Sequence, residues 1–258
     1  MTNPEAPIVV SIEDHVLTIA FNRPTKKNAI NQEMYSLMHQ GLETAAENNS
    51  IRVVLFRGKE DCFTSGNDIV DFLSSGEHSA ELPVVKFLNS LMRFQKPIVA
   101  AVNGPAIGIG TTLLLHCDLV VAAEEALFQL PFTSLGICPE AASSFILPLL
   151  TGHQKAAELL MFGDKFSAQE AQAIGLVNRV TSRANFLQLA NELANRLAAQ
   201  PPSALRATKA LLKRSNQATL EATLQVEMKV LGELLVGPEA REAMTAFMEK
   251  RAPDFSQF

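Results

Sequence analysis

Short apolar runs alternate with longer amphipathic runs through the first half of the chain. Two strand-like segments, residues 8–13 and 16–21, flank the sequence EDH, which predicts a β-hairpin. From Asn31, a suitable helix N-cap, apolar residues recur at helical spacing. Helices at 81–94 and 111–117 are expected to alternate with buried strands at 53–58, 97–102 and 119–123. This alternation favours an α/β fold.

After Pro139 the pattern becomes almost entirely helical. Ser167 and Glu170 have the spacing of a capping box, and Gly175 ends that helix before a short apolar run at 176–180. Further helices are expected at 141–150, 154–162, 185–200, 203–214, 222–236 and 238–252. The pattern predicts a core over residues 1–195 and a helical C-terminal region over 196–258, which covers the core or mediates trimerisation.

One stretch, residues 97–117, contains no acidic or basic side chain and is long enough to span a membrane. Its middle is interrupted by polar, glycine and proline residues, namely Asn103, Gly104, Pro105, Gly108 and Gly110. A buried strand, a glycine turn and a buried helix therefore explain it better than a membrane span.

Composition narrows the function classes. The 258 residues are 47% hydrophobic, which is typical of a soluble globular protein with a large core. A net charge of −5 and the lack of a long Lys/Arg run argue against a nucleic-acid partner. The three cysteines have no C-x-x-C spacing, so neither a disulfide framework nor a zinc site is expected. With no secretory signal at the N-terminus, a cytoplasmic location is expected.

Several familiar catalytic motifs are missing. There is no H-E-x-x-H, no phosphate-binding P-loop, and Gly108-Ile-Gly110 lacks the third glycine of a dinucleotide fingerprint. Ser134 lacks the first glycine of a nucleophile elbow. His116 closes an apolar helix, so a hydrogen-bonded core histidine is the favoured interpretation. No metal site is expected.

Two glycine turns follow predicted strands. CFTSGND follows the strand at 53–58, and NGPAIGIGTT follows the strand at 97–102. Backbone N–H groups left unpaired on both turns could converge on one oxygen, as an oxyanion hole requires. For either turn alone, the simpler interpretation is that the glycines only shape the turn.

The segment ICPEAASSF contains a single acid, Glu140, directly after Pro139. On its own it favours a helix start, because proline suits the first helical position and an acid the first turn. A buried catalytic acid is the alternative.

Four segments occur in the order and spacing of a known family: RPTKKNAI, FTSGND, AAVNGPAIGIGTTLLLHCDLVVAA and FQLPFTSLGICPE. Through them nearly the whole chain resembles the crotonase, or enoyl-CoA hydratase/isomerase, superfamily. The resemblance implies an α/β crotonase (ClpP-like) spiral of ββα units with a helical C-terminal region, assembled as a homotrimer or dimer of trimers. It also implies an acyl-CoA thioester as substrate, with no further cofactor.

The resemblance implies particular site residues. The thioester oxygen is expected to accept hydrogen bonds from the backbone N–H groups of Ser65 and Ile109, although the family commonly has glycine at the second position. Lys26 or Lys27 is expected to meet the CoA phosphates. The other substrate-binding residues implied are Ala29, Gly66, Asn67, Asp68, Ile69 and Gly108.

The chemistry implied is isomerisation. Family hydratases have two glutamates where this chain has Thr112 and Phe132, so efficient hydration is not expected. LGICPEAASSF instead resembles the segment with the single catalytic glutamate of peroxisomal-type Δ3,Δ2-enoyl-CoA isomerases, which makes Glu140 the proton carrier. Apolar neighbours raise the pKa of such a carboxyl and a helix terminus lowers it, so its value is left open. A weak hydratase, a dienoyl-CoA isomerase and a non-catalytic acyl-CoA-binding module stay alternatives.

Overall fold

A six-stranded sheet organises the chain in the order β1-β2-β3-β4-β6-β9. The computed structural model describes residues 5–69, 71 and 82–258. The first two strands form an antiparallel hairpin, and the remaining strands add in parallel. The strands are β1 (Ile8–Glu13), β2 (Val16–Phe21), β3 (Val53–Arg57), β4 (Ile98–Val102), β6 (Leu119–Ala123) and β9 (Arg179–Thr181).

The predicted hairpin is confirmed. Its turn residues, Asp14 and His15, both have positive φ, at 46° and 68°. A two-residue turn of this kind matches the right-handed twist of the flanking strands. The small polar side chain of Asp14 tolerates the left-handed conformation.

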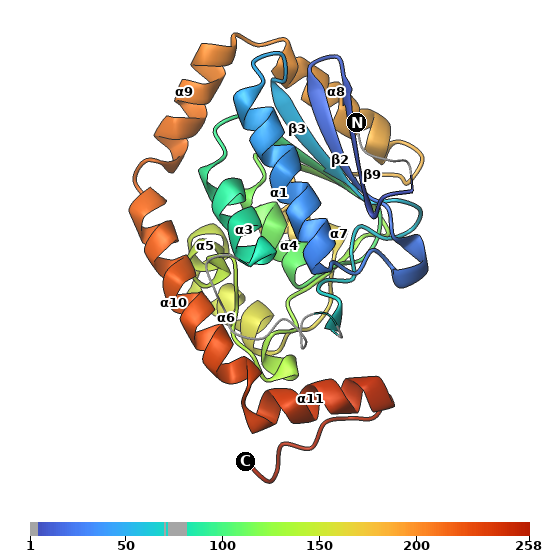
Figure 1. Ribbon diagram of the computed structural model, residues 1–258, viewed down its shortest axis with the longest axis vertical. Coiled ribbons are helices and arrows are strands. Elements are labelled where there is room, and N and C mark those ends of the chain that lie inside the picture. Colours follow the sequence, from blue (N-terminus) through green and yellow to red (C-terminus); the bar gives the residue numbers. More distant parts are fainter. Residues whose placement is uncertain (1–4, 70, 72–81) are drawn as a thin grey trace.

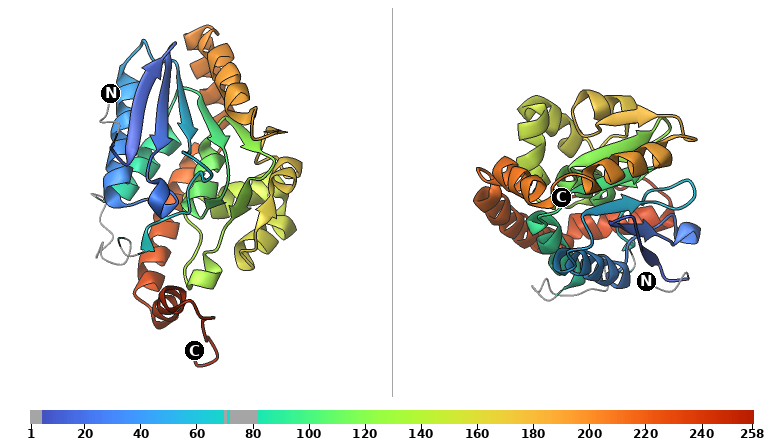
Figure 2. Two further views of the ribbon diagram at one scale, coloured as in Figure 1. Left: turned by 90° about the vertical axis from the view of Figure 1, so that its right-hand side faces the viewer. Right: turned by 90° about the horizontal axis from the view of Figure 1, so that it is seen from above.

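Helices cover both faces of the sheet (Figures 1 and 2). Along β3, Val54 and Phe56 belong to the main core, which includes α1 (Gln32–Glu47) and α3 (Pro83–Arg93). Val53 and Leu55 point the other way and pack with the alanines of α8 (Phe186–Ala198). This two-residue period explains why the strand is apolar throughout. The N-cap predicted for α1 is confirmed, because the Asn31 side chain accepts from the Met34 N–H.

A second sheet was not predicted from the sequence. It consists of three very short strands, β5 (Ala106–Ile107), β7 (Leu127–Gln129) and β8 (Phe166–Ser167). Strands of two or three residues are too short to show a periodic pattern, which is why the sequence did not reveal them.

The apolar stretch over residues 97–117 forms a strand, a glycine turn and a short helix, as expected. The helix predicted at 111–117 begins earlier, as α4 (Ile109–Thr112), and tightens into the 3-10 turn η2 (Leu113–His116). None of the helices in the described part of the chain is both long and apolar enough to cross a membrane.

The second half is helical, as predicted. The capping box between Ser167 and Glu170 is present, and Gly175 follows that helix with φ at 85°. The domain boundary predicted after residue 195 falls inside α8. The helices are α5 (Ser143–Thr151), α6 (His153–Met161), α7 (Ala168–Ala173), α9 (Pro202–Lys213), α10 (Gln217–Leu235) and α11 (Pro238–Glu249), and two further 3-10 turns are η1 (Pro24–Lys26) and η3 (Thr133–Leu135).

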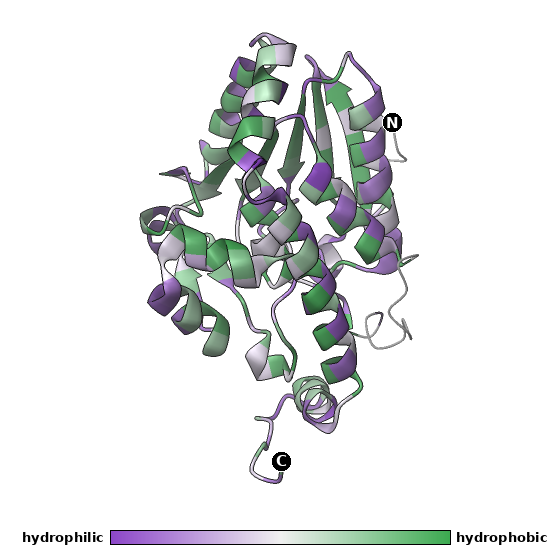
Figure 3. Ribbon diagram, turned by 90° about the vertical axis from the view of Figure 1, so that its left-hand side faces the viewer, coloured by the Kyte–Doolittle hydropathy of each residue, from purple (hydrophilic) through white to green (hydrophobic). Residues whose placement is uncertain are grey.

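Helices α9 and α10 run along one side of the molecule and lead to α11 at its end (Figure 1). Figure 3 shows that side, where apolar and polar residues alternate along both helices. Leu211 and Leu212 on α9 and Val226 on α10 are more than 60% exposed. Large apolar side chains this exposed are typical of surfaces that meet another protein.

Candidate active site

Glu140 does not lie in a helix. Ala141 and Ala142, which follow it, both have left-handed backbone conformations, with φ at 56° and 57°. Helix α5 begins only at Ser143, so the interpretation of Glu140 as a first-turn acid is wrong. Two consecutive non-glycine residues in this conformation cost about 1–2 kcal/mol each, and surrounding contacts must hold them there.

The Glu140 side chain is buried, with 7% of the residue exposed. The Thr112 hydroxyl donates to Glu140 Oε1 across 3.0 Å. Burial raises the pKa of the Glu140 carboxyl to about 7; the Thr112 hydrogen bond opposes this rise and the charge of Glu227 adds to it. The question left open by the sequence is thereby answered, because desolvation dominates and no helix terminus lies at Glu140.

The two positions where family hydratases have acids lie at this site. Thr112 is fully buried and bonds Glu140 directly. Phe132 is buried at 4% exposure and lines the neighbouring cavity.

A cavity of about 290 Å³ lies where the two glycine turns meet. The turns are joined by a bridge between Thr64 and Ala106, in which the Ile107 N–H donates to the Thr64 carbonyl across 3.0 Å. Predicted site residues from both turns therefore share one wall. The lining residues are Ser65, Gly66, Asn67, Ile69, Ile107, Gly108, Ile109, Gln129, Pro131, Phe132, Ser134, Leu135, Ile137, Met244 and Phe247.

Ser65 is not available as an oxyanion donor, contrary to the prediction. Its N–H already donates to the Lys27 carbonyl across 3.0 Å. Asn67, two residues further on, forms an isolated parallel bridge with Ile30. The hydrogen bonds of this bridge use the Gly66 carbonyl and the Asp68 N–H. The N–H of Asn67 itself therefore points to the other side of the chain. Within the described chain, the Asn67 and Ile109 N–H groups have no acceptor. Of the predicted donor pair, Ile109 therefore keeps an open N–H at the cavity, and Asn67 has the second open N–H in place of Ser65.

The sequence indicates Asn67 as a candidate substrate contact but not as a candidate oxyanion donor. The register of the bridge between Ile30 and Asn67 identifies Asn67 as the residue with the open N–H. A sequence does not give the register of an isolated bridge. Ile109 has its side chain in the main core at 1% exposure, so it keeps its N–H at the cavity without filling it.

Glu140 is not itself among the cavity's lining residues, but several contacts place it beside the wall. Thr112, which bonds it, lies three residues after Ile109 in the same helix. The Tyr35 hydroxyl donates to Asn67 Oδ1 across 2.6 Å. Burial and then the negative charge of Glu140 raise the pKa of Tyr35, which places the carboxylate near this hydroxyl.

The loop before α1 supports the cavity from outside. Arg23 pairs with Asp68 across 2.7 Å and also donates to the Ala29 carbonyl. Lys27 pairs with Asp61 at the surface across 3.1 Å, and Lys26 is exposed. Lys26, Lys27 and Ala29 do not line the cavity, so any contact with a ligand would lie beyond its mouth.

His116 is a core residue, as predicted. It is 3% exposed, and its Nε2 lies 2.7 Å from the Ala141 carbonyl oxygen, so Nε2 carries the donated proton. Burial lowers the pKa of His116 to about 4, which keeps the ring neutral near pH 7. In the described part of the chain, no cluster of His, Cys, Asp or Glu could hold a metal ion.

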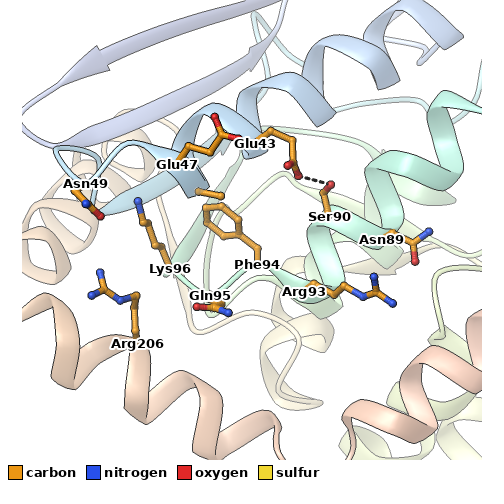
Figure 4. A pocket seen from close by; sticks show the side chains of 11 residues that line it. Glu43, Glu47, Asn49, Asn89, Ser90, Arg93, Phe94, Gln95, Lys96 and Arg206 are labelled. Atoms are coloured by element: carbon orange, nitrogen blue, oxygen red, sulfur yellow. Dashed lines mark hydrogen bonds between the residues drawn. The ribbon is translucent and has the colours of Figure 1, made fainter.

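A larger groove of about 590 Å³ lies between α1, α3 and α9 (Figure 4). Two of its charged side chains have local partners: Glu43 accepts from the Ser90 hydroxyl, and Lys96 donates to the Ala45 and Asn48 carbonyls. The groove shares no lining residue with the cavity beside Glu140. It brings together none of the predicted site residues, so volume alone does not identify the site.

Known proteins resemble this chain over nearly its whole length. Residues 11–258 match the model of the family described as enoyl-CoA hydratase/isomerase. The chain is 37% identical to enoyl-CoA delta isomerase 2 of Rattus norvegicus over 95% of its own length and 64% of the rat protein. It is 36% identical to 2,3-dehydroadipyl-CoA hydratase of Escherichia coli, over 96% of its own length and 98% of that protein.

Among solved structures, an enoyl-CoA hydratase/isomerase from Pseudoalteromonas atlantica superimposes with a TM-score of 0.94. The two are 39% identical, and the match covers 97% of this chain and all of the other.

Proposed function

The chain belongs to the enoyl-CoA hydratase/isomerase family, and on that premise we propose that it moves the double bond of a 3-enoyl-CoA to the 2-trans position. The α/β crotonase fold expected from the sequence is confirmed by the solved structures. The observation that carries the proposal is the buried carboxyl of Glu140, with its pKa at about 7, beside a cavity with two backbone donors. None of the described residues that line this cavity is an acid.

The proposed reaction needs one base that later acts as an acid. Ionised Glu140 removes a proton from C2 of the 3-enoyl thioester, and the electrons move into the thioester carbonyl to give a dienolate. The N–H groups of Asn67 and Ile109 donate to the resulting oxyanion, which is where preorganised donors contribute most. Protonated Glu140 then returns the proton at C4, so the double bond ends between C2 and C3. A pKa near 7 suits a group that must both take and return a proton.

Thr112 and Phe132 support the proposal of isomerisation over hydration. Hydration needs one group to activate water and another to deliver a proton, and neither a threonine hydroxyl nor a phenyl ring exchanges protons at neutral pH. Thr112 instead fixes Glu140 Oε1. A weak hydratase is the second candidate, because the Escherichia coli relative matched over nearly its whole length is named a hydratase.

The proposed ligand and assembly rest on the same premise. The proposed substrate is an acyl-CoA thioester bound along Ser65 to Ile69 and Gly108, with exposed Lys26 as the cation for the CoA phosphates, since Lys27 is paired with Asp61. The exposed leucines of α9 support the proposal of a homotrimer or a dimer of trimers.

The test compares the parent with Glu140→Gln on 3-hexenoyl-CoA and crotonyl-CoA. The amide keeps the shape and the bond from Thr112 but removes the base, so kcat for isomerisation should fall by ~10²–10⁴-fold while substrate still binds. Glu158→Gln, which removes an exposed carboxylate paired with Lys155, is the matched control. Parent protein that hydrates crotonyl-CoA faster than it isomerises 3-hexenoyl-CoA, or a Gln variant with near-parent turnover, would contradict the proposal.

A further inference from the structure

A second buried acid, Glu227, reaches the active site from helix α10. It is 6% exposed, and the proposed reaction does not use it. Its Oε2 accepts from the Ala142 N–H across 2.6 Å. Its Oε1 accepts from the Ser144 N–H and hydroxyl across 2.9 and 2.5 Å. Because both oxygens accept and every partner is a donor, the arrangement suits an ionised carboxylate.

Glu227 and His116 hold the same peptide unit from opposite sides. His116 Nε2–H donates to the carbonyl of Ala141, and Glu227 accepts the N–H of Ala142. That peptide bond lies between the two residues with left-handed backbone, one residue after Glu140. Since alanine rarely adopts this conformation without support, these two contacts keep the chain from relaxing. The direction in which Glu140 leaves the backbone therefore depends on them.

We propose that Glu227 is a positioning residue for Glu140, acting through the Ala141–Ala142 peptide. Its effect on turnover rests on the proposed isomerase function. Its effect on the position of Glu140 rests on the geometry alone. Helix α10 of the C-terminal region places the Glu227 carboxylate against the turn that follows Glu140 and holds that turn by hydrogen bonds.

The charge of Glu227 also affects the pKa of the Glu140 carboxyl. The neighbours of Glu140 are Thr112 from α4, Tyr35 from α1, Cys138 in its own segment and Glu227 from α10. His116 from η2 bonds the adjacent residue, Ala141. Near pH 7 His116 is neutral, and burial raises the pKa values of Tyr35 and Cys138, the latter to about 11, so both stay protonated. Burial raises the pKa of Glu227 as well, but the hydrogen bonds that Ser144 and Ala142 donate to it oppose that rise and favour the ionised carboxylate. Its negative charge disfavours a second negative charge on Glu140, so it helps to keep Glu140 basic.

The experiment separates position from charge with two variants. Glu227→Gln keeps the shape and one accepting oxygen but removes the charge, whereas Glu227→Ala removes both. Glu233→Gln, an exposed acid on the same helix, is the control. In protein labelled with ¹³C at the glutamate side chains, the Glu140 resonance is assigned by its loss in Glu140→Gln. Its titration midpoint should move below about 7 in Glu227→Gln and stay in place in the control.

Kinetics on 3-hexenoyl-CoA supply the second readout. In Glu227→Ala, kcat should fall by about 10²-fold with KM little changed, because a displaced base affects the chemical step and not thioester binding. Glu227→Gln should retain more activity, with the acid limb of its pH–rate profile at lower pH. Circular dichroism verifies the fold of each variant.

Two results would overturn the proposal: a Glu140 midpoint unchanged in Glu227→Gln, or a folded Glu227→Ala with parent kcat. Failure of the isomerase function would appear differently, as a parent protein without activity on 3-hexenoyl-CoA. In that case the titration of Glu140 still decides whether Glu227 controls it.

Discussion

At the scale of single residues, the burial that raises the pKa of Glu140 also makes the stability of the protein depend on pH. Its carboxyl has an ordinary pKa of about 4.5 in the unfolded chain and about 7 in the native protein. Between these values the native state holds a proton that the unfolded state has released. Stability from this group is therefore full below about pH 4.5 and is lost as the pH rises through 7.

Glu140→Gln should consequently stabilise the protein, and more so at high pH. The amide carries no charge to bury and still accepts from Thr112, so its advantage over the parent should grow by on the order of 2 kcal/mol between pH 5 and pH 8. Urea unfolding at both pH values measures this. A first-turn acid would give the opposite sign, a loss of ~0.3–1 kcal/mol. A variant less stable than the parent at pH 8 would therefore refute the buried-acid account.

At the scale of elements, the contact between η3 and α11 shapes the cavity. Gly136 ends η3 with φ at 68°, and a Cβ built there would lie 2.6 Å from the Ala240 backbone nitrogen on α11. That approach allows Met244 and Phe247 of α11 to line the same cavity as the two glycine turns. The last helix of the chain is thus part of its own proposed binding site.

Gly136→Ala should push α11 away and weaken substrate binding. We expect KM for 3-hexenoyl-CoA to rise about tenfold, equivalent to ~1.4 kcal/mol of lost binding, with a smaller effect on kcat. Gly152→Ala is the matched control, because Gly152 also has positive φ but a Cβ there would meet nothing within 4 Å. The Gly152→Ala protein should be less stable than the parent because of backbone strain, but its KM should be unchanged. Equal KM values in the two variants would show that α11 does not shape the site.

At the scale of the whole molecule, buried polar side chains attach the C-terminal helices to the core. Lys209 on α9 donates to the Lys96 carbonyl and to Asp118, each across 2.7 Å, and its side chain is 6% exposed. Asp118 also accepts the N–H of Ile98, at the start of β4. With Glu227 on α10, this gives the helical region two polar anchors in addition to its apolar contacts.

Lys209→Met should therefore destabilise the protein by about 2–3 kcal/mol, somewhat less than for a fully buried pair because Asp118 is 29% exposed. Adding Asp118→Asn should cost less than the sum of the two single changes, since the charge left unpaired is then removed. Denaturant unfolding of the four proteins measures the coupling. Lys155→Met, which breaks an exposed pair with Glu158, should change stability by less than about 0.5 kcal/mol. Additive effects of Lys209→Met and Asp118→Asn would mean that the pair does not anchor α9.

Much of the fold could be predicted because its causes are local. The hairpin turn at Asp14 and His15, the Asn31 cap and the Ser167–Glu170 capping box each depend on residues a few positions apart. The helix start at Pro139 that the segment ICPEAASSF favours on its own is wrong for a non-local reason. Ala141 and Ala142 are held in left-handed conformations by His116 and Glu227, the latter 85 residues from Ala142, and the helix begins only after them.

The sequence by itself determined the alternation of strands and helices, the two glycine turns and the choice of Glu140 as the candidate acid. Tertiary structure decided which groups can act. Ser65 N–H is occupied by Lys27, whereas Asn67 N–H is left open by the register of the Ile30 bridge. Burial among α1, α4, η2 and α10 set the pKa of Glu140. Propensity and periodicity act between neighbours in the chain, but hydrogen-bond register and desolvation depend on residues that only folding brings together.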